Sequence, residues 1–238
     1  MIYEFTRSEK LLGKEAMGIL KNSAIAVFGI GGVGSYTAEA LCRCGVGHLT
    51  FVDNDVVSVT NINRQIIALH STIGKHKTEV MKERALDINP SAKIETFNCF
   101  FNEETCEQFD FEKYDYVVDA IDTVKSKLLL IELAGRARTK IISSMGTGNK
   151  LDPSQLEITD IYKTEVCPLA RAVRKEAKQR KIKKLKVLFS REVPVKISEN
   201  LDDTEDLKNG YPAPASISFV PSVAGLMIAG EVVRDLIK

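Results

Sequence analysis

Two groups of residues in the short stretch 25–65 have the types and spacing needed to bind a nucleotide. The first is the glycine-rich turn Gly29-Ile-Gly31-Gly32-Val-Gly34, which follows an apolar run. Glycines let a backbone turn sharply and approach a phosphate, and the first amides of the following helix then face the anion. Asp53 follows about 20 residues later, where a carboxylate commonly accepts hydrogen bonds from ribose hydroxyls. This pattern predicts a nucleotide site, but its spacing alone does not separate NAD, FAD, S-adenosylmethionine and ATP.

The second group gathers charged and amide side chains in the stretch that begins at Asp53. Its members are Asp53, Asp55, Asn61, Asn63, Arg64 and Gln65. Two further motifs, Gly74-x-x-Lys77 and Asp119-x-x-Asp122, stand at the start of a predicted helix and after a predicted strand. All of them come from the carboxyl ends of successive predicted strands, where open α/β sheets bind their ligands.

These side chains suit a triphosphate that is chemically consumed. A triphosphate requires fixed cations and usually a metal. Arg64 and Lys77 supply cations, and Asp122 is placed to hold Mg²⁺, which prefers oxygen ligands. Asn61 and Gln65 can donate neutral hydrogen bonds to phosphate or ribose. A surface ion-pair network would explain any one of these residues, but it does not explain all of them at one edge of a sheet. ATP is therefore the predicted nucleotide.

Apolar, β-rich runs alternate with helix-like segments between residues 24 and 145. Strands are predicted at 24–28, 48–52, 93–98, 116–120 and 140–144, and helices at 33–44, 77–86 and 125–137. This alternation predicts a Rossmann-like α/β fold, a mostly parallel sheet with helices on both faces. The later elements are predicted strands at 156–161 and 185–189, a basic helix at 168–184 and an apolar helix at 219–237.

Composition narrows the class of protein. The chain has 238 residues, a hydrophobic content of 44% and a net charge of +1, so it is neither a polycation nor an acidic tail protein. We expect no membrane partner, because no apolar run approaches the roughly 18 residues that cross a bilayer. Residues 1–10 lack the apolar core of a secretory signal, which favours a cytoplasmic protein. The five cysteines include no Cys-x-x-Cys pair, and we interpret Cys167 as structural.

At these motifs the sequence resembles the ubiquitin-activating-enzyme-like adenylating family, which includes bacterial MoeB and ThiF. In that family a carboxylate attacks the α-phosphate of ATP and gives an acyl adenylate and pyrophosphate. The resemblance implies ribose at Asp53, phosphates at Arg64 and Lys77, and Mg²⁺ at Asp122. The implied ATP-binding set is Gly29, Gly31, Gly32, Gly34, Asp53, Asp55, Asn61, Arg64, Gln65, Lys77 and Asp122. It also implies a homodimer in which Arg7 reaches the ATP of the partner subunit, so that the catalytic set is Arg7, Arg64, Lys77 and Asp122.

Further segments resemble the tRNA threonylcarbamoyladenosine dehydratase branch of this family. They are 5–7 with 12–13, 60–66, 119–122, 150–153, 160–164, 168–170 and 216–221. The resemblance implies that threonylcarbamoyladenosine in tRNA is adenylated on its carboxylate and cyclised with loss of water. It leaves a sulfur-transfer partner protein open. We expect a single adenylating, ThiF-like domain over 1–238, with a nucleotide-binding core at 24–145 and a tRNA-facing insertion and C-terminal helix at 146–238.

The predicted helix at 168–184 offers a surface for tRNA. Nine basic residues stand between positions 171 and 186, against the single acid Glu176. A clustered cationic face on a near-neutral protein is typical of contact with a phosphate backbone. The tRNA-binding residues we predict are Arg171, Arg174, Lys175, Lys178 and Lys181. The alternative is an ordinary solvated helix, which the acidic stretch 199–206 could pair with.

Three other functions compete with this interpretation. MoeB- and ThiF-type enzymes adenylate the C-terminus of a ubiquitin-like sulfur-carrier protein, but they carry two Cys-x-x-Cys zinc pairs, and this chain has none. An NAD-dependent oxidoreductase would not need the Asn-x-x-Arg-Gln and Gly-x-x-Lys motifs. A catalytically silent, nucleotide-responsive protein would not need every charged group to be kept.

Overall fold

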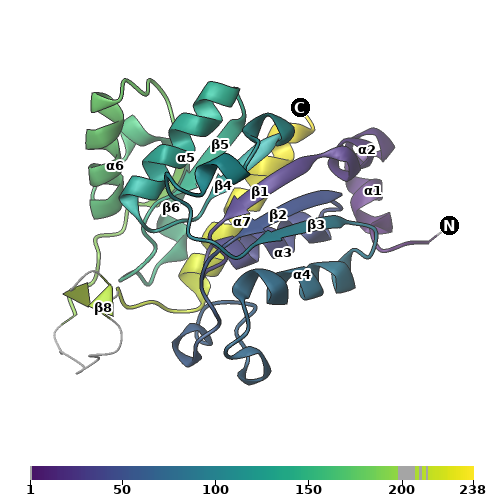
Figure 1. Ribbon diagram of the computed structural model, residues 1–238, viewed down its shortest axis with the longest axis horizontal. Helices are drawn as coiled ribbons and strands as arrows, with labels where there is room; N and C mark the ends of the chain where they lie inside the picture. Colours follow the sequence, from purple (N-terminus) through teal and green to yellow (C-terminus); the bar gives the residue numbers. More distant parts are fainter. Residues whose placement is uncertain (1, 198–206, 209–210, 213) are drawn as a thin grey trace.

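A seven-stranded sheet organises the computed structural model, which describes residues 2–197, 207–208, 211–212 and 214–238 (Figure 1). The acidic stretch 199–206 lies outside the described residues. The strand order within the described residues is β3-β2-β1-β4-β5-β7-β6. The strands are β1 (Ala24–Phe28), β2 (His48–Val52), β3 (Lys93–Phe97), β4 (Tyr116–Asp119), β5 (Lys140–Ser144), β6 (Leu156–Asp160) and β7 (Lys186–Ser190). A separate short pair joins β8 (Leu207–Lys208) to β9 (Tyr211–Pro212).

The sheet is mostly parallel, as the sequence predicts. Its strands pair in parallel from β3 to β7, and β6 alone runs antiparallel, against β7. The chain passes from β1 outward to β2 and β3, and then crosses to β4 on the other side of β1. This reversal creates a switch point at the carboxyl ends of β1 and β4, which is where a ligand-binding crevice forms in such sheets.

Helices cover both faces of the sheet. They are α1 (Thr6–Leu12), α2 (Lys14–Asn22), α3 (Gly34–Arg43), α4 (Lys77–Ile88), α5 (Val124–Ala137), α6 (Pro168–Gln179) and α7 (Phe219–Leu236). Successive residues of β1 point to opposite faces. Ile25 belongs to the apolar cluster that includes residues of α3 and α7, whereas Phe28 belongs to the cluster that includes residues of α5. In the described part of the chain, no helix combines the length and apolarity needed to cross a bilayer.

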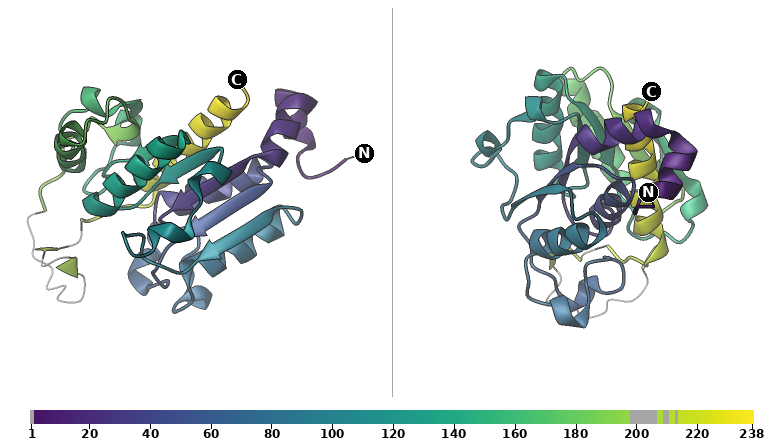
Figure 2. Two further views of the ribbon diagram at one scale, coloured as in Figure 1. Left: turned by 45° about the horizontal axis from the view of Figure 1, so that its top comes forward. Right: turned by 90° about the vertical axis from the view of Figure 1, so that its right-hand side faces the viewer.

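Two stretches differ from the sequence-based prediction. Residues 6–22, for which no helix was predicted, form α1 and α2, which lie with the end of α7 at one end of the molecule (Figures 1 and 2). The predicted helix at 168–184 was wrong at its end, because α6 ends at Gln179. Lys181 has a φ of 56°, and the Ile182 amide donates to the Ala177 carbonyl at 3.0 Å, which closes the helix.

The apolar helix α7 packs directly on α3 at Gly225. A Cβ at this position would lie 2.4 Å from the Val33 carbonyl oxygen and 3.0 Å from the Thr37 amide nitrogen. The Thr37 hydroxyl also donates to the Gly225 carbonyl at 3.1 Å. Because α3 follows the glycine turn, this contact fixes the element that presents the predicted phosphate site.

We expect Gly225→Ala to lower the free energy of unfolding by about 1–3 kcal/mol, because α7 must move away from the α3 backbone. Gly230→Ala in the same helix is the matched control, since its nearest neighbour is the flexible end of Arg234 at 3.3 Å. The control should be neutral or stabilising by up to about 1 kcal/mol. Urea denaturation followed by circular dichroism measures both. Equal destabilisation of the two variants would contradict the proposed contact.

Candidate functional site

The glycine turn between β1 and α3 is packed too closely to hold side chains. Gly29 has a φ of 90°, and a Cβ on it would lie 2.6 Å from the Ala120 carbonyl oxygen. A Cβ on Gly34 would lie 1.7 Å from the Gly29 carbonyl oxygen. The turn therefore requires glycine at both positions. Its packing brings the first turn of α3 against the loop that follows β4.

Asp53, at the end of β2, is bound to this turn. One carboxylate oxygen accepts from the Ile30 amide at 2.6 Å, and the other accepts from the Asp55 amide at 2.8 Å. Burial raises the pKa of Asp53 above its ordinary value, while Lys77 and the two amides act in the opposite direction. The half-buried carboxylate lies where a ribose bound beside the turn would present its hydroxyls.

Lys77 provides a buried cation at the same edge. It is the first residue of α4 and is 5% exposed. Its ammonium donates to the Asp55 carboxylate at 2.7 Å, and its backbone amide donates to the Asp55 carbonyl at 3.1 Å. The Asp55 side chain is 47% exposed, so the pair opens to solvent on the acid's side. An arriving phosphate would compete with Asp55 for this ammonium.

The polar segment after the 3₁₀ turn η1 (Val59–Asn61) reaches the glycine turn from the other side. Arg64 is half-buried, and its guanidinium donates to the Thr60 carbonyl at 2.8 Å; its Cγ lies 3.5 Å from the Cβ position of Gly32. Gln65 is 6% exposed, and its Nε2 lies 3.9 Å from the Cβ position of Gly31. Its Oε1 is buried without a hydrogen-bond partner in the described structure.

Asn61 has a structural partner at this point. Its side-chain oxygen accepts from the Ser58 amide at 3.1 Å and so caps η1. Asn63 donates to the Ser216 carbonyl at 3.0 Å, which ties the segment to the approach of α7. The predicted hydrogen bond from Asn61 to a nucleotide therefore has to come from its amide nitrogen.

Asp122 lies exposed on the loop between β4 and α5, and it accepts from the Thr123 hydroxyl at 3.4 Å. A fully buried ion pair lies beneath this loop. The Lys127 ammonium donates to Asp119 at 2.9 Å and to the Ile121 carbonyl at 2.8 Å, and both charged side chains are 0% exposed. The Ser143 hydroxyl donates to the second Asp119 oxygen. Sequence analysis missed Lys127, because nothing in the sequence separates it from the exposed Lys125.

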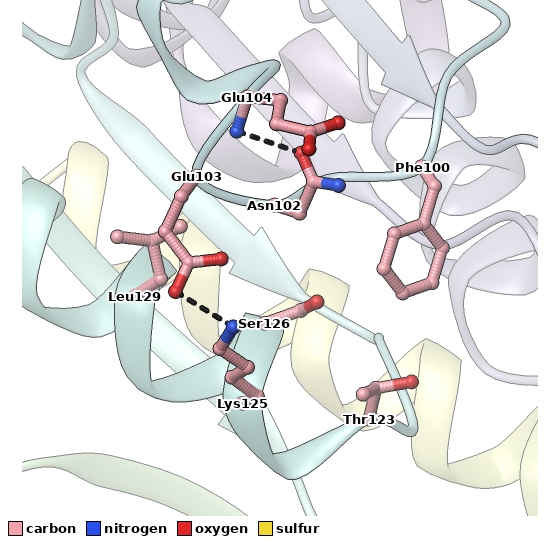
Figure 3. Close-up of a pocket in the computed structure, with 8 residues that line it drawn as sticks. All are labelled: Phe100, Asn102, Glu103, Glu104, Thr123, Lys125, Ser126 and Leu129. Carbon is pink, nitrogen blue, oxygen red and sulfur yellow. Dashed lines mark hydrogen bonds and ion pairs between the residues drawn. The ribbon is translucent and has the colours of Figure 1, made fainter.

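An open pocket of about 450 Å³ lies beside the same loop (Figure 3). It is lined by Phe100, Asn102, Glu103, Glu104, Thr123, Lys125, Ser126 and Leu129. Phe100 is 45% exposed, and Lys125 pairs with Glu103 at 3.0 Å across the pocket. Sequence analysis did not select Phe100, although an aromatic residue just past the carboxyl end of β3 was a usable signal.

Arg7 does not join this cluster within its own chain. It is exposed on α1, and α1 and α2 lie at the amino ends of the strands. Phe5 lies 3.5 Å from the Cβ position of Gly45, and the Gly47 amide donates to the Leu20 carbonyl at 3.1 Å just before β2. Because the glycine turn follows the carboxyl end of β1, Arg7 and the turn lie at opposite ends of the strands.

The predicted tRNA-binding residues divide into two kinds. Arg171, Lys175, Lys178 and Lys181 are exposed. Arg174 is half-buried, and its guanidinium donates to the Thr164 carbonyl at 2.7 Å, so it holds α6 on the turn before it. Cys167 is free, 2% exposed and packed in an apolar cluster, which agrees with the structural interpretation.

Known proteins share this arrangement. The profile of the ThiF family matches residues 5–238. A tRNA threonylcarbamoyladenosine dehydratase of Bacillus subtilis (strain 168) is 45% identical over 244 residues, covering 100% of this chain and 96% of that protein. The crystal structure of E. coli tRNA N6-threonylcarbamoyladenosine dehydratase, TcdA, with AMP has a TM-score of 0.88 and 32% identity, covering 98% of this chain and 93% of that one. With ATP, the same E. coli protein gives a TM-score of 0.87 and 33% identity over the same shares.

We expect Lys127→Met to lower the free energy of unfolding by about 3–5 kcal/mol, because it leaves the Asp119 carboxylate buried without its cation. Lys125→Met is the matched control on the same helix, since the Lys125 side chain is 73% exposed, and it should cost less than about 1 kcal/mol. Chemical denaturation measures both values. A similar small loss in the two variants would show that the buried pair does not hold the Asp122 loop.

Proposed function

This chain belongs to the ThiF family, and we propose that it is an ATP-dependent tRNA-modifying enzyme that dehydrates threonylcarbamoyladenosine to its cyclic form. The observation that carries the proposal is the 45% identity, over the whole chain, to a named dehydratase of this kind. The ATP- and AMP-bound E. coli structures, which match nearly the full chain, support ATP as the cosubstrate. Adenylation of a sulfur-carrier protein, the alternative, has weaker support from these comparisons.

The proposed chemistry activates a poor electrophile. An oxygen of the threonyl carboxylate attacks the α-phosphorus of ATP, the bond to the β-phosphate oxygen breaks, and pyrophosphate leaves. A nitrogen of the same modified base then attacks the acyl carbon, and AMP departs with the carboxylate oxygen while the nitrogen loses its proton. The second step is intramolecular, so orientation replaces a covalent enzyme intermediate. A buried Cys167 is therefore no obstacle to the reaction.

The glycine turn and four side chains at the carboxyl ends of the strands have roles in this proposal. The glycine turn and the first amides of α3 face the phosphates, and Asp53 holds the ribose. Arg64 and Lys77 neutralise the charge that develops as pyrophosphate leaves. Phe100, in the pocket beside the Asp122 loop, is the residue we propose to contact the base.

Asp122 is the residue that would hold Mg²⁺. The fit rests on its exposed carboxylate at the edge where the phosphates would lie, because Mg²⁺ favours one or two carboxylates together with phosphate and water oxygens. The ion would shield the phosphate charge when bound. ATP with Mg²⁺ is thus the proposed cofactor set.

We extend the proposal to the assembly and its setting. Arg7 lies at the amino ends of the strands, away from the nucleotide site of its own chain. This position supports a homodimer in which Arg7 contacts the ATP of the partner subunit. Residues 24–145 would hold the nucleotide, and 146–238 would face the tRNA, in the cytoplasm, where tRNA and ATP are both present. The sulfur-transfer partner stays a prediction, because no step of the dehydration moves sulfur.

The experiment that tests the function is AMP and pyrophosphate release in the presence of verified threonylcarbamoyladenosine-containing tRNA. Mass spectrometry of the digested nucleosides should show loss of one water from the modified base. The control is tRNA that lacks the modification. No AMP release above that control would overturn the proposal.

Replacing the phosphate-binding cations should slow the reaction without unfolding the protein. We expect Arg64→Ala and Lys77→Ala each to lower the rate of AMP release by roughly 10²–10³-fold, since a preorganised donor is lost in the transition state. Lys75→Ala is the control, because Lys75 is exposed two residues before Lys77. If both site variants released AMP at the wild-type rate, Arg64 and Lys77 would have no role in the mechanism.

Arg7 can be tested by complementation between subunits. Arg7→Ala and Lys77→Ala chains with different tags are co-expressed, and the mixed species is isolated by two successive affinity steps. Each variant alone should be nearly inactive, whereas the mixed dimer should recover about half of the wild-type rate, because one of its two symmetric sites is intact. An inactive mixed dimer, or failure of the two chains to co-purify, would refute the action of Arg7 across the interface.

A further inference from the structure

A basic groove lies at the amino ends of β5 and β7, whereas the nucleotide site lies at the carboxyl ends of the strands. The groove is an open hollow of about 580 Å³ between α5, β5 and the segment that joins α6 to β7. Its lining includes the apolar residues Ile131, Ile141, Ile182 and Leu185 and the cations Arg136, Arg180, Lys183 and Lys184. Glu132 is the one carboxylate in that lining, and it pairs with Arg180 at 3.1 Å. The groove therefore presents a net positive charge over an apolar floor.

The fold assembles this groove from two distant stretches. Residues 136–138 end α5, and residues 180–184 follow α6, and the two helices lie side by side (Figures 1 and 2). Arg138 and Lys181 are exposed; Lys181 stands between two lining residues in sequence, and Arg138 stands two residues after the lining residue Arg136. Arg136, Lys183 and Lys184 are exposed as well. The basic surface thus extends beyond α6 onto a second helix.

Both helices end in the same backbone motif, with a cation at its strained position. Arg138 has a φ of 60° and Lys181 a φ of 56°. The amide after each donates back into its helix, Thr139 to Ala134 at 2.9 Å and Ile182 to Ala177 at 3.0 Å. This is the Schellman arrangement, in which glycine is the usual residue because it alone adopts a positive φ without strain.

The end of α3 shows the ordinary form of the motif in this same chain. There Gly45 has a φ of 85°, and the Val46 amide donates to the Leu41 carbonyl at 3.2 Å. Beside the basic groove the same motif carries Arg138 and Lys181, against the backbone preference for glycine; Asn149 and Val166, elsewhere in the described residues, also have a positive φ. A cation at a helix C-terminus also interacts favourably with the helix dipole, and this effect is the structural alternative to a binding role.

We propose that the basic groove binds the phosphate backbone of RNA, with Arg138 and Lys181 as phosphate contacts. The proposal rests on the proposed function in so far as that RNA is the tRNA substrate. The groove lies at the amino ends of β5 and β7, whereas Asp53 and Asp122 follow the carboxyl ends of their strands. A five-residue strand spans about 16 Å, so one nucleoside cannot occupy both places. The groove holds the body of the tRNA while the modified base is at the nucleotide edge.

The double variant Arg138→Gly/Lys181→Gly separates the binding role from the structural one. Glycine relieves the backbone strain at both positions, so the variant should keep or raise the melting temperature. Its Kd for tRNA should rise about tenfold or more at 100 mM salt, and the slope of log K against log salt should become shallower by about 1–2. Fluorescence anisotropy with labelled tRNA between 50 and 200 mM salt measures both quantities.

A matched charge control lies on the far side of the sheet, at the outer strand β3, which four strands separate from β7 in the strand order. Lys82→Gln/Lys93→Gln, on α4 and β3, removes the same charge, and it should leave the Kd within about twofold, because only local phosphate contacts carry the effect. Equal weakening by both double variants would mean that net charge alone matters, and it would overturn the proposal. A lower melting temperature with unchanged tRNA affinity in the glycine variant would assign Arg138 and Lys181 to helix capping.

Failure of the groove and failure of the function give different results. A trinucleotide with the modified nucleoside at its centre cannot span the roughly 16 Å between the two ends of a strand, so the glycine variant should release AMP from it at the wild-type rate and lose efficiency only with whole tRNA. If the variant modified whole tRNA as efficiently as the wild-type protein, the proposed role of the groove would be wrong. If the wild-type protein released no AMP from either RNA, the proposed function would be wrong. The comparison of binding to unmodified tRNA would still test whether the groove binds RNA.

Discussion

The contact between the glycine turn and the loop after β4 is the constraint on which the site depends. A Cβ on Gly34 would lie 1.7 Å from the Gly29 carbonyl, and one on Gly29 would lie 2.6 Å from the Ala120 carbonyl. The backbones touch because β1 and β4 are neighbours at the point where the strand order reverses. This contact brings the α3 amides and Asp122 to one edge, and the buried pair of Asp119 and Lys127 fixes the loop from below.

The cations at this edge are paired before any nucleotide arrives. Lys77 is held by Asp55, and Arg64 is held by the Thr60 carbonyl and by Asn63. A buried ammonium without a partner would be costly, so the Asp55 carboxylate stabilises the Lys77 side chain in this position. A phosphate that bound at Lys77 would replace one anionic partner by another, with little rearrangement of that side chain. Such preorganisation is what a reaction limited by phosphate charge requires.

The sequence predicted the core of the fold because each central strand is an apolar run with clear ends. The ranges of β1, β2 and β5 match the predicted ones. The glycine turn, Asp53, Asp55, Arg64, Gln65 and Lys77 come together as expected, because the carboxyl ends of parallel strands share one edge. The end of α6 was misplaced because a positive φ at a lysine has no sequence signal. The burial of Lys127 and the engagement of Arg174 depend on tertiary neighbours, which the local sequence does not reveal.

In this proposal, adenylation takes place at the carboxyl ends of the strands, and the RNA substrate is recognised at the basic groove near the amino ends of β5 and β7. In the proposed reaction, adenylation uses contacts to the phosphates at the carboxyl ends of the strands. Choice of an RNA substrate needs contacts beyond the reacting nucleoside, and these must lie elsewhere on the surface. A net charge of +1 gives no long-range attraction for RNA, so the attraction has to come from local clusters. The ends of α5 and α6 form such a cluster only after folding, because 136–138 and 180–184 are distant in sequence.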